Sequence, residues 1–212
     1  MREPVARAGL TLDEFRSLHA QVQADPVLDI AGEGLRLLNR YPEHPLAEVK
    51  LKLLRYHEKI LTLAQSTKDY FRKEPMCIVN TEVNSGNFIV REDDAFLVDW
   101  EKAVVSCRYQ DLGHFLVPTT TLWKTDYLYS EEEKRTFLSA YREELSLNIP
   151  PDELREKTRI LERTITLRGL SWCFMAYYEY TRTSRRLKND STFSRIKYYL
   201  DNADYLIGLA GL

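Results

Sequence analysis

Three oxygen-bearing side chains near the middle of this sequence have the types and spacing that suit metal chemistry. Glu82 and Asn87 lie in the polar segment 80–87 (NTEVNSGN), and Asp99 follows a short apolar run farther along the chain. If the chain between them folds as a hairpin, all three side chains meet at one end of a small sheet. Oxygen clusters of this kind suit Mg²⁺, which takes a few protein oxygens together with phosphate oxygens and water.

The elements that must position these residues are short strands. The apolar run 76–79 (MCIV) follows Pro75 and predicts a buried strand. Two further runs, 88–90 (FIV) and 95–98 (AFLV), are separated by an acidic turn and predict a hairpin. This is the only clear β region that the sequence indicates, so the candidate site is expected to lie on a small sheet.

The segment 76–116 resembles the aminoglycoside phosphotransferase and choline kinase-like family, which are small-molecule kinases of the protein-kinase-like fold. That family carries a strand, then His-Gly-Asp-hydrophobic-x-x-Gly-Asn, a hairpin, Ile-Asp-Trp-Glu, and later Asp-Leu at the start of a helix. The matching residues here are 80–87 (NTEVNSGN), 98–101 (VDWE) and 111–112 (DL). The resemblance implies an ATP-dependent transferase that moves the γ-phosphoryl group to the hydroxyl of a small molecule, with Mg²⁺ and ATP as cofactors.

The resemblance implies a role for each matched residue. Asn87 would be a metal ligand, and Asp99 would hold the metal that bridges the ATP phosphates. Asp111 would brace the catalytic loop through hydrogen bonds. Glu82 stands where the family has its catalytic Asp, so it would accept the proton of the substrate hydroxyl.

Two residues of the loop depart from the family pattern. Asn80 stands in place of the loop His, and Glu82 in place of the catalytic Asp. Because Glu is one methylene longer, its carboxylate is displaced unless the loop adjusts, and a misplacement of about 1 Å can cost about a hundredfold in rate. The metal pair Asn87 and Asp99 keeps the family residues.

Helical patterns surround the β segment on both sides. Before it, a capping box of Thr11 and Glu14 starts a helix that reaches Val22, and further helices are predicted over 27–40 and 46–72. We expect one domain over residues 1–212. Its predicted fold class is α+β, predominantly helical, and by resemblance it is the C-terminal lobe of a protein-kinase-like fold.

After the β segment, Ser130 opens a second capping box (SEEE). Long helices are then predicted over 152–181 and 193–210, the second from an apolar stripe at helical spacing. The aromatic residues of the first helix line a substrate pocket, form a cation-binding cage, or pack in the helical core. Their helical spacing favours the core. These residues are Trp172, Phe174, Tyr177, Tyr178 and Tyr180.

The strand-rich N-terminal lobe of the family is expected to be absent from this chain. No segment before residue 75 predicts a strand, and Gly32 and Gly34 form a G-x-G without a third glycine. The chain alone is therefore expected to be inactive. Apolar residues such as Phe88, Phe96 and Trp100 would lose their cover, which predicts self-association or a partner on the face of the absent lobe.

Composition and charge exclude several other classes of protein. The chain has 30 basic and 32 acidic residues, so it offers no electrostatic argument for nucleic acid or an anionic membrane. No apolar stretch is long enough to span a bilayer. The three cysteines form no C-x-x-C pair, which favours reduced thiols and a cytoplasmic location over disulfides or structural zinc.

Two alternatives to a kinase remain open at this point. The chain could be a degenerate kinase-like lobe that acts as a non-catalytic module and binds a ligand or a protein. It could also be a purely structural helical domain, in which Glu82 is a solvated loop acid and Asp99 caps a turn. The joint spacing of Glu82, Asn87, Asp99 and Asp111 favours the phosphotransferase site over both.

Overall fold

The computed structural model of the chain describes residues 21–92, 94–182 and 190–211. The capping box at Thr11 and Glu14 lies outside these residues. Val22, predicted at the end of that helix, instead forms a parallel bridge with Val105. Two backbone hydrogen bonds hold it, from the Gln23 N–H to the Val105 oxygen (2.8 Å) and from the Val105 N–H to the Gln21 oxygen (2.9 Å). The helical prediction for Val22 is therefore wrong. The backbone around Val22 instead makes hydrogen bonds to the otherwise unpaired edge of the buried strand that contains Val105.

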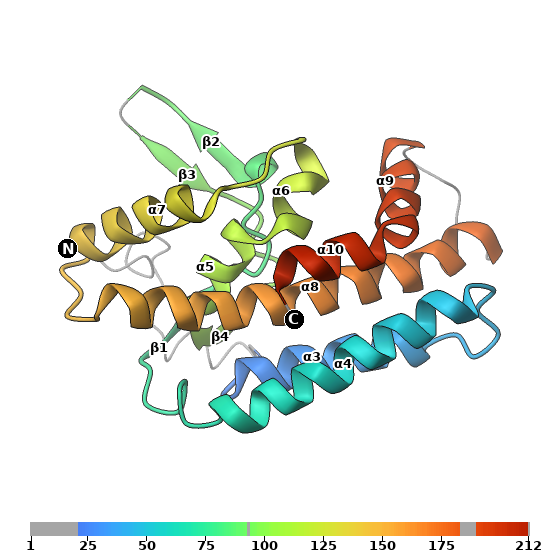
Figure 1. The fold of residues 1–212 in the computed structure, drawn as a ribbon. Coiled ribbons are helices and arrows are strands. Elements are labelled where there is room, and N and C mark those ends of the chain that lie inside the picture. Colours follow the sequence, from blue (N-terminus) through green and yellow to red (C-terminus); the bar gives the residue numbers. More distant parts are fainter. Residues whose placement is uncertain (1–20, 93, 183–189, 212) are drawn as a thin grey trace.

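A long helix, α8 (Pro151–Arg182), is the central element of the fold. Figure 1 shows α3 (Pro26–Asn39) and α4 (Ala47–Thr67) along one side of α8, with the hairpin of residues 88–97 and the helices that follow it on the other. Because α8 is covered on both sides, buried residues occur all round it rather than along one stripe. The predicted helices over 27–40, 46–72 and 152–181 are confirmed, with α4 ending earlier than predicted.

Three helices follow the β segment before α8 begins. They are α5 (Tyr109–Leu116), α6 (Pro118–Lys124) and α7 (Glu131–Glu144). The capping box predicted for α7 is confirmed, since the Ser130 hydroxyl accepts from the Glu133 N–H (3.2 Å) and the Glu133 carboxylate accepts from the Ser130 N–H (2.8 Å). The start of α7 could be predicted because its signal is local.

The single helix predicted over 193–210 is wrong. The structure divides it into α9 (Asp190–Asp201) and α10 (Ala203–Ala210), with a non-helical backbone at Asn202. The Asn202 amide donates to the Tyr198 carbonyl oxygen (2.8 Å), as Asn side chains do where they interrupt helices. The break redirects the chain, so that the two halves of one apolar stripe pack as separate helices (Figure 1).

The described residues contain two antiparallel strand pairs. The predicted hairpin is confirmed as β2 (Phe88–Val90) and β3 (Ala95–Leu97), preceded by a short 3₁₀ turn at Ser85–Asn87. The predicted strand β1 (Met76–Val79) does not join this hairpin. It pairs instead with β4 (Val104–Cys107), which sequence analysis missed. The β4 sequence VVSC is buried at every position, so it lacks the alternation that marks a half-exposed strand.

The helical class predicted from the sequence is confirmed, since helices account for 65% of the described residues and strands for 8%. None of the described helices combines the length and the apolar character needed to cross a membrane. Of the hairpin aromatics, Phe96 and Trp100 are exposed, whereas Phe88 is half-buried and contacts the ring of Phe115. Association through this face stays a prediction.

Candidate functional site

The candidate site forms where the loop after β1 meets the loop after β3. The buried side chain of Asn80 joins them, because its Nδ2 donates to the Asp99 carbonyl oxygen (2.9 Å) and its Oδ1 accepts from the Glu82 N–H (3.0 Å). The Thr81 hydroxyl adds a hydrogen bond to the Lys102 carbonyl oxygen (3.1 Å). The sequence predicted that the site lies at one end of a single sheet. In the structure, the two loops follow strands of two separate pairs, and side chains hold the loops together.

Two residues of these loops have left-handed backbones. The φ angle is 64° at Thr81 and 63° at Asp99. Asp adopts this region with modest cost, but it is unusual for a β-branched residue such as Thr. Strained residues of this kind cost about 1–3 kcal/mol each and persist where the surroundings hold them. Thr81 directly precedes Glu82, so the two left-handed residues lie in the loops that bring Glu82 and Asp99 together.

Asp111, in the first turn of α5, holds the loop after β1 through two hydrogen bonds. Its Oδ2 accepts from the Asn80 N–H (2.8 Å) and its Oδ1 from the Thr81 N–H (2.9 Å). These are the contacts expected of the predicted brace. Burial raises the pKa of Asp111 to about 6 and outweighs the two N–H hydrogen bonds, which favour the ionised carboxylate.

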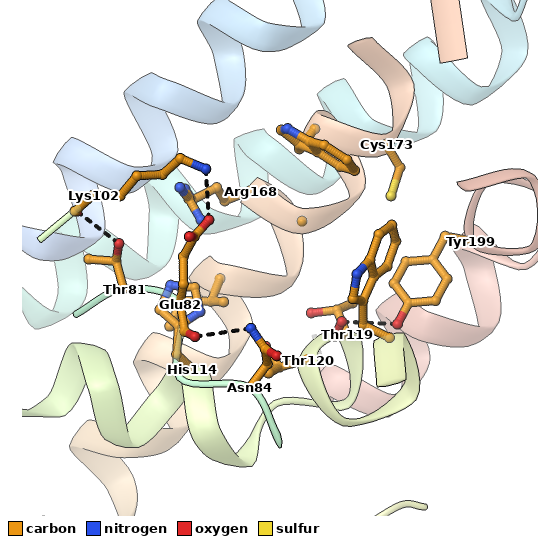
Figure 2. Close-up of a pocket in the computed structure, with 14 residues that line it drawn as sticks. Thr81, Glu82, Asn84, Lys102, His114, Thr119, Thr120, Arg168, Cys173 and Tyr199 are labelled. Atoms are coloured by element: carbon orange, nitrogen blue, oxygen red, sulfur yellow. Dashed lines mark hydrogen bonds and ion pairs between the residues drawn. The ribbon is translucent and has the colours of Figure 1, made fainter. Parts of the chain in front are cut away.

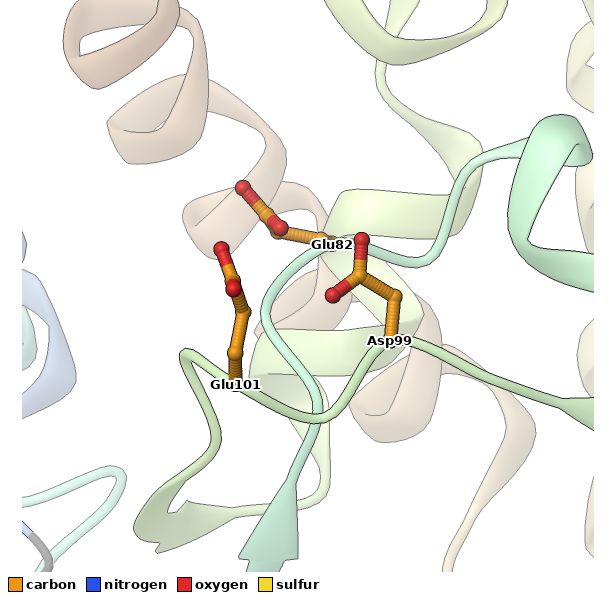
Figure 3. A group of neighbouring side chains, drawn as sticks. All are labelled: Glu82, Asp99 and Glu101. Atoms are coloured by element: carbon orange, nitrogen blue, oxygen red, sulfur yellow. The ribbon is translucent and has the colours of Figure 1, made fainter.

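Three carboxylates converge above this brace. Figure 3 shows Glu82 on one loop facing Asp99 and Glu101 on the other, with one oxygen of each side chain within 4.8 Å of the others. Glu82 is half-buried and pairs with the Lys102 ammonium (2.8 Å), whereas Asp99 and Glu101 are exposed. The sequence analysis placed Glu82 and Asp99 together and assigned no role to Glu101, although it lies in the same VDWE motif.

Asn87 is tied to both loops. Its Nδ2 donates to the Glu82 carbonyl oxygen (2.9 Å), and its own carbonyl oxygen accepts from the Val98 N–H (2.9 Å). The residue predicted as the second metal ligand therefore lies beside the chain neighbour of Asp99. Because Nδ2 is directed to Glu82, the Oδ1 of Asn87 is the atom that would serve as a ligand.

A cavity of about 240 Å³ opens beside Glu82 (Figure 2). Its charged lining residues are Glu82, Lys102 and Arg168. Its aromatic lining residues are Trp123, Trp172 and Tyr199. The core interpretation holds for Phe174, which is buried, but is wrong for Trp172, which is 37% exposed and lines the cavity. Helical spacing cannot separate these two residues, because α8 has neighbours on both sides.

His114 is a further lining residue that the sequence analysis missed. It is 6% exposed, and among the described residues its Nε2 has no hydrogen-bond partner. Burial, with a smaller effect from the positive charge of Arg168, lowers the pKa of His114 to about 3. The imidazole is therefore neutral at physiological pH. No sequence signal marked it, since the four histidines are scattered along the chain.

Comparison with family models and with curated proteins gives no match for this chain. The kinase-like resemblance therefore stays a prediction, which depends on residues 80–87, residues 98–101 and Asp111. What the geometry supplies independently is a braced loop, a convergent acidic cluster and an adjoining cavity.

Proposed function

We propose that this chain carries the catalytic and metal-binding part of a Mg²⁺-dependent phosphotransferase, which transfers the γ-phosphoryl group of ATP to the hydroxyl of a small molecule. The observation that carries the proposal is the convergence of Glu82 and Asp99 from two loops, with Asp111 bracing the first loop. The backbone adds support, because Thr81 has positive φ at the position where the family pattern has Gly.

The residues at the convergence fit Mg²⁺. The carboxylates of Asp99 and Glu101 are hard oxygen donors within 4.8 Å of Glu82, and the Asn87 amide lies on the same pair of loops. Asp99, Asn87 and Glu101 would hold the ion. When bound, the ion supplies neutralisation of the phosphate charge that develops during transfer.

The chain's own residues would do the remaining work by positioning. Glu82 lines the cavity, so its carboxylate can accept the proton of a hydroxyl bound there. The ion pair with Lys102 fixes the direction of that carboxylate. Asn80 and Asp111 act as positioning residues, since they set the backbone from which Glu82 projects. Phosphoryl transfer depends mainly on such positioning and on electrostatics.

Metal binding is the primary test, because we expect full turnover to need phosphate contacts from an N-terminal lobe. Mn²⁺ binding should be measured by electron paramagnetic resonance with and without ADP. Wild-type protein should bind Mn²⁺, Asp99→Asn should abolish binding, and Asp152→Asn, at an exposed acid on α8, should leave it unchanged. Failure of the wild-type protein to bind Mn²⁺ with or without ADP would reject the proposal.

Catalysis is tested on protein that shows transfer from Mg²⁺-ATP to small alcohols. Glu82→Gln should lower kcat by about 10²–10⁴ with little change in KM, because the base acts in the transition state. A raised KM with unchanged kcat would contradict the role of Glu82. Mass spectrometry of the phosphorylated product is the measurement.

A non-catalytic binding module is the second candidate. The Glu82–Lys102 ion pair favours it, because the carboxylate in the position of the catalytic base is already engaged by a cation. On this hypothesis, the wild-type chain binds neither Mn²⁺ nor nucleotide at Asp99, and no form of the protein transfers phosphate. The two candidates thus differ in metal binding, which can be measured on this chain alone.

A further inference from the structure

We propose that the cavity beside Glu82 binds a one-ring aromatic alcohol that carries an anionic group such as a carboxylate, and that it disfavours cationic amines. The inference rests on the proposed function only in taking this cavity as the acceptor site. It is carried by two features of the cavity, an aromatic corner and the Arg168 guanidinium in the wall beside His114.

The aromatic corner is built from perpendicular rings. The ring centroids of Trp123 and Trp172 are 5.7 Å apart at an interplanar angle of 83°, and those of Trp123 and Tyr199 are 5.5 Å apart at 81°. The Tyr199 hydroxyl donates to the Thr119 carbonyl oxygen (2.9 Å), which fixes that ring. A flat ring entering the cavity can stack on one indole and meet the other edge to face.

The charged end of the cavity has two sides, and only the Arg168 side can attract an anion. On the other side, Asp99 and Glu101 lie within 4.8 Å of Glu82 and make the surroundings of Lys102 acidic. Lys102 is paired with Glu82 inside the cavity lining. Arg168 is held through its Nε by Glu33 (2.9 Å), which is not a lining residue. This leaves the terminal nitrogens of Arg168 as donors, and a guanidinium matches a carboxylate with two parallel hydrogen bonds.

The pKa of His114 shows that the cavity wall beside Arg168 carries a positive potential. Burial is the main reason that its imidazole stays neutral, and the positive charge of Arg168 adds to that effect. A bound ammonium group would meet the same positive charge, whereas a carboxylate would be attracted to it. The neutral imidazole offers the ligand a hydrogen-bonding group without adding charge.

The size of the cavity limits the ligand. At about 240 Å³ it is smaller than the cavities of about 300–1,000 Å³ that hold drug-sized ligands. One six-membered ring with two short substituents suits this space. With the ring at the aromatic corner and the anion at Arg168, a second substituent can bring a hydroxyl to Glu82.

The proposal is tested with three ligands that differ only in charge: 4-(hydroxymethyl)benzoate, 4-(hydroxymethyl)benzamide and 4-(hydroxymethyl)benzylamine. Calorimetry without nucleotide or metal measures their affinities for the wild-type chain. We expect the benzoate to bind at least about tenfold more tightly than the benzylamine, with the benzamide between them. Equal or tighter binding of the benzylamine, or no binding of any of the three, would overturn the proposal.

Two substitutions separate the Arg168 cation from its ion pair. Arg168→Gln should abolish the preference for the benzoate over the benzamide. Glu33→Gln breaks the same ion pair but keeps the cation, so it should retain or increase the preference. If Arg168→Gln does not fold, the wild-type charge series and Glu33→Gln still decide the matter. A preference that survives Arg168→Gln, or disappears in Glu33→Gln, would contradict the assignment.

These readouts also separate this inference from the proposed function. Charge-selective binding with no Mn²⁺ binding and no phosphate transfer would support the ligand class and reject the phosphotransferase. Transfer of phosphate to the benzylamine in preference to the benzoate would support the phosphotransferase and reject the ligand class. Trp172→Ala should weaken all three ligands alike, because it removes the stacking surface and leaves the charge.

Discussion

Two regions of this molecule gather charged side chains and treat them in opposite ways. Between α7 and α8, Glu162 accepts hydrogen bonds from Lys134 and from Arg155 (2.6 Å), and Arg155 also pairs with Glu131 (2.9 Å). The side chains of Glu162 and Arg155 are each 6% exposed. Every charge of this network is paired with one of opposite sign, so the network needs no further ligand to be stable.

The acidic cluster is the contrasting region. Glu82, Asp99 and Glu101 place three like charges within 4.8 Å of one another, and Lys102 pairs with Glu82. Asp99 and Glu101 are exposed, so solvent screens the repulsion between their carboxylates. The fold therefore pairs opposite charges in the α7–α8 network and leaves like charges together at the site that we propose binds a cation.

The largest expected effect is in the α7–α8 network. Glu162→Ala leaves Lys134 and Arg155 buried without their shared acceptor, so it should lower the free energy of unfolding by about 3–5 kcal/mol. Asp152→Ala is the control, because it breaks an exposed pair with Arg135 and should cost less than about 1 kcal/mol. Urea denaturation measures both. Equal losses in the two variants would show that the buried network contributes no more to stability than a surface ion pair.

An intermediate effect is expected at the brace. Asp111→Ala strands the N–H groups of Asn80 and Thr81, which should lower the free energy of unfolding by about 1–3 kcal/mol. The loss should be the same with and without Mg²⁺, since Asp111 is not assigned as a ligand. Thermal melts in both conditions test this. A loss that appears only with Mg²⁺ would move Asp111 into the metal site.

The pH dependence of stability sharpens the role of Asp111. Its folded pKa, raised to about 6, exceeds its ordinary value of 3.8. Between these values the folded chain keeps a proton that the unfolded chain has lost, so the contribution of Asp111 to stability falls as pH rises. Asp111→Asn should flatten the curve between pH 4 and pH 6, as measured by urea denaturation. An unchanged slope would mean that other groups cause it.

The smallest effect is expected at the acidic cluster without metal. Asp99→Asn removes one of three like charges and keeps a residue that tolerates positive φ, so it should be neutral or stabilise by up to about 1 kcal/mol at low salt. The same variant should lose any stabilisation by Mg²⁺ with ADP. Strong destabilisation of Asp99→Asn in metal-free buffer would show that Asp99 is structural and would erase the contrast between the two regions.

Much of the site could be predicted because its signals are local. The hairpin at 88–98 and the Ser130 capping box depend on neighbours in the chain. The sequence also predicted that Glu82 and Asp99 face each other, but it placed them on one sheet, whereas the Asn80 side chain joins loops that leave two strand pairs. The brace contacts of Asp111 followed from motif spacing and the resemblance, and the structure contains them. The pairing of β1 with β4 could not be predicted, because β4 is buried on both faces and its sequence VVSC does not alternate.

The sequence by itself determined the helical class, the helices α3 and α8, the strands β1 to β3 and the loop on which the candidate base lies. Only the tertiary structure decided that Glu101 joins the acidic cluster, and that Trp172 and Arg168 meet Glu82 at one cavity. The physical reason is that periodicity tells which residues share a face of a helix. Which face becomes a core and which borders a cavity depends on the segments that pack there, and these lie far apart in the chain.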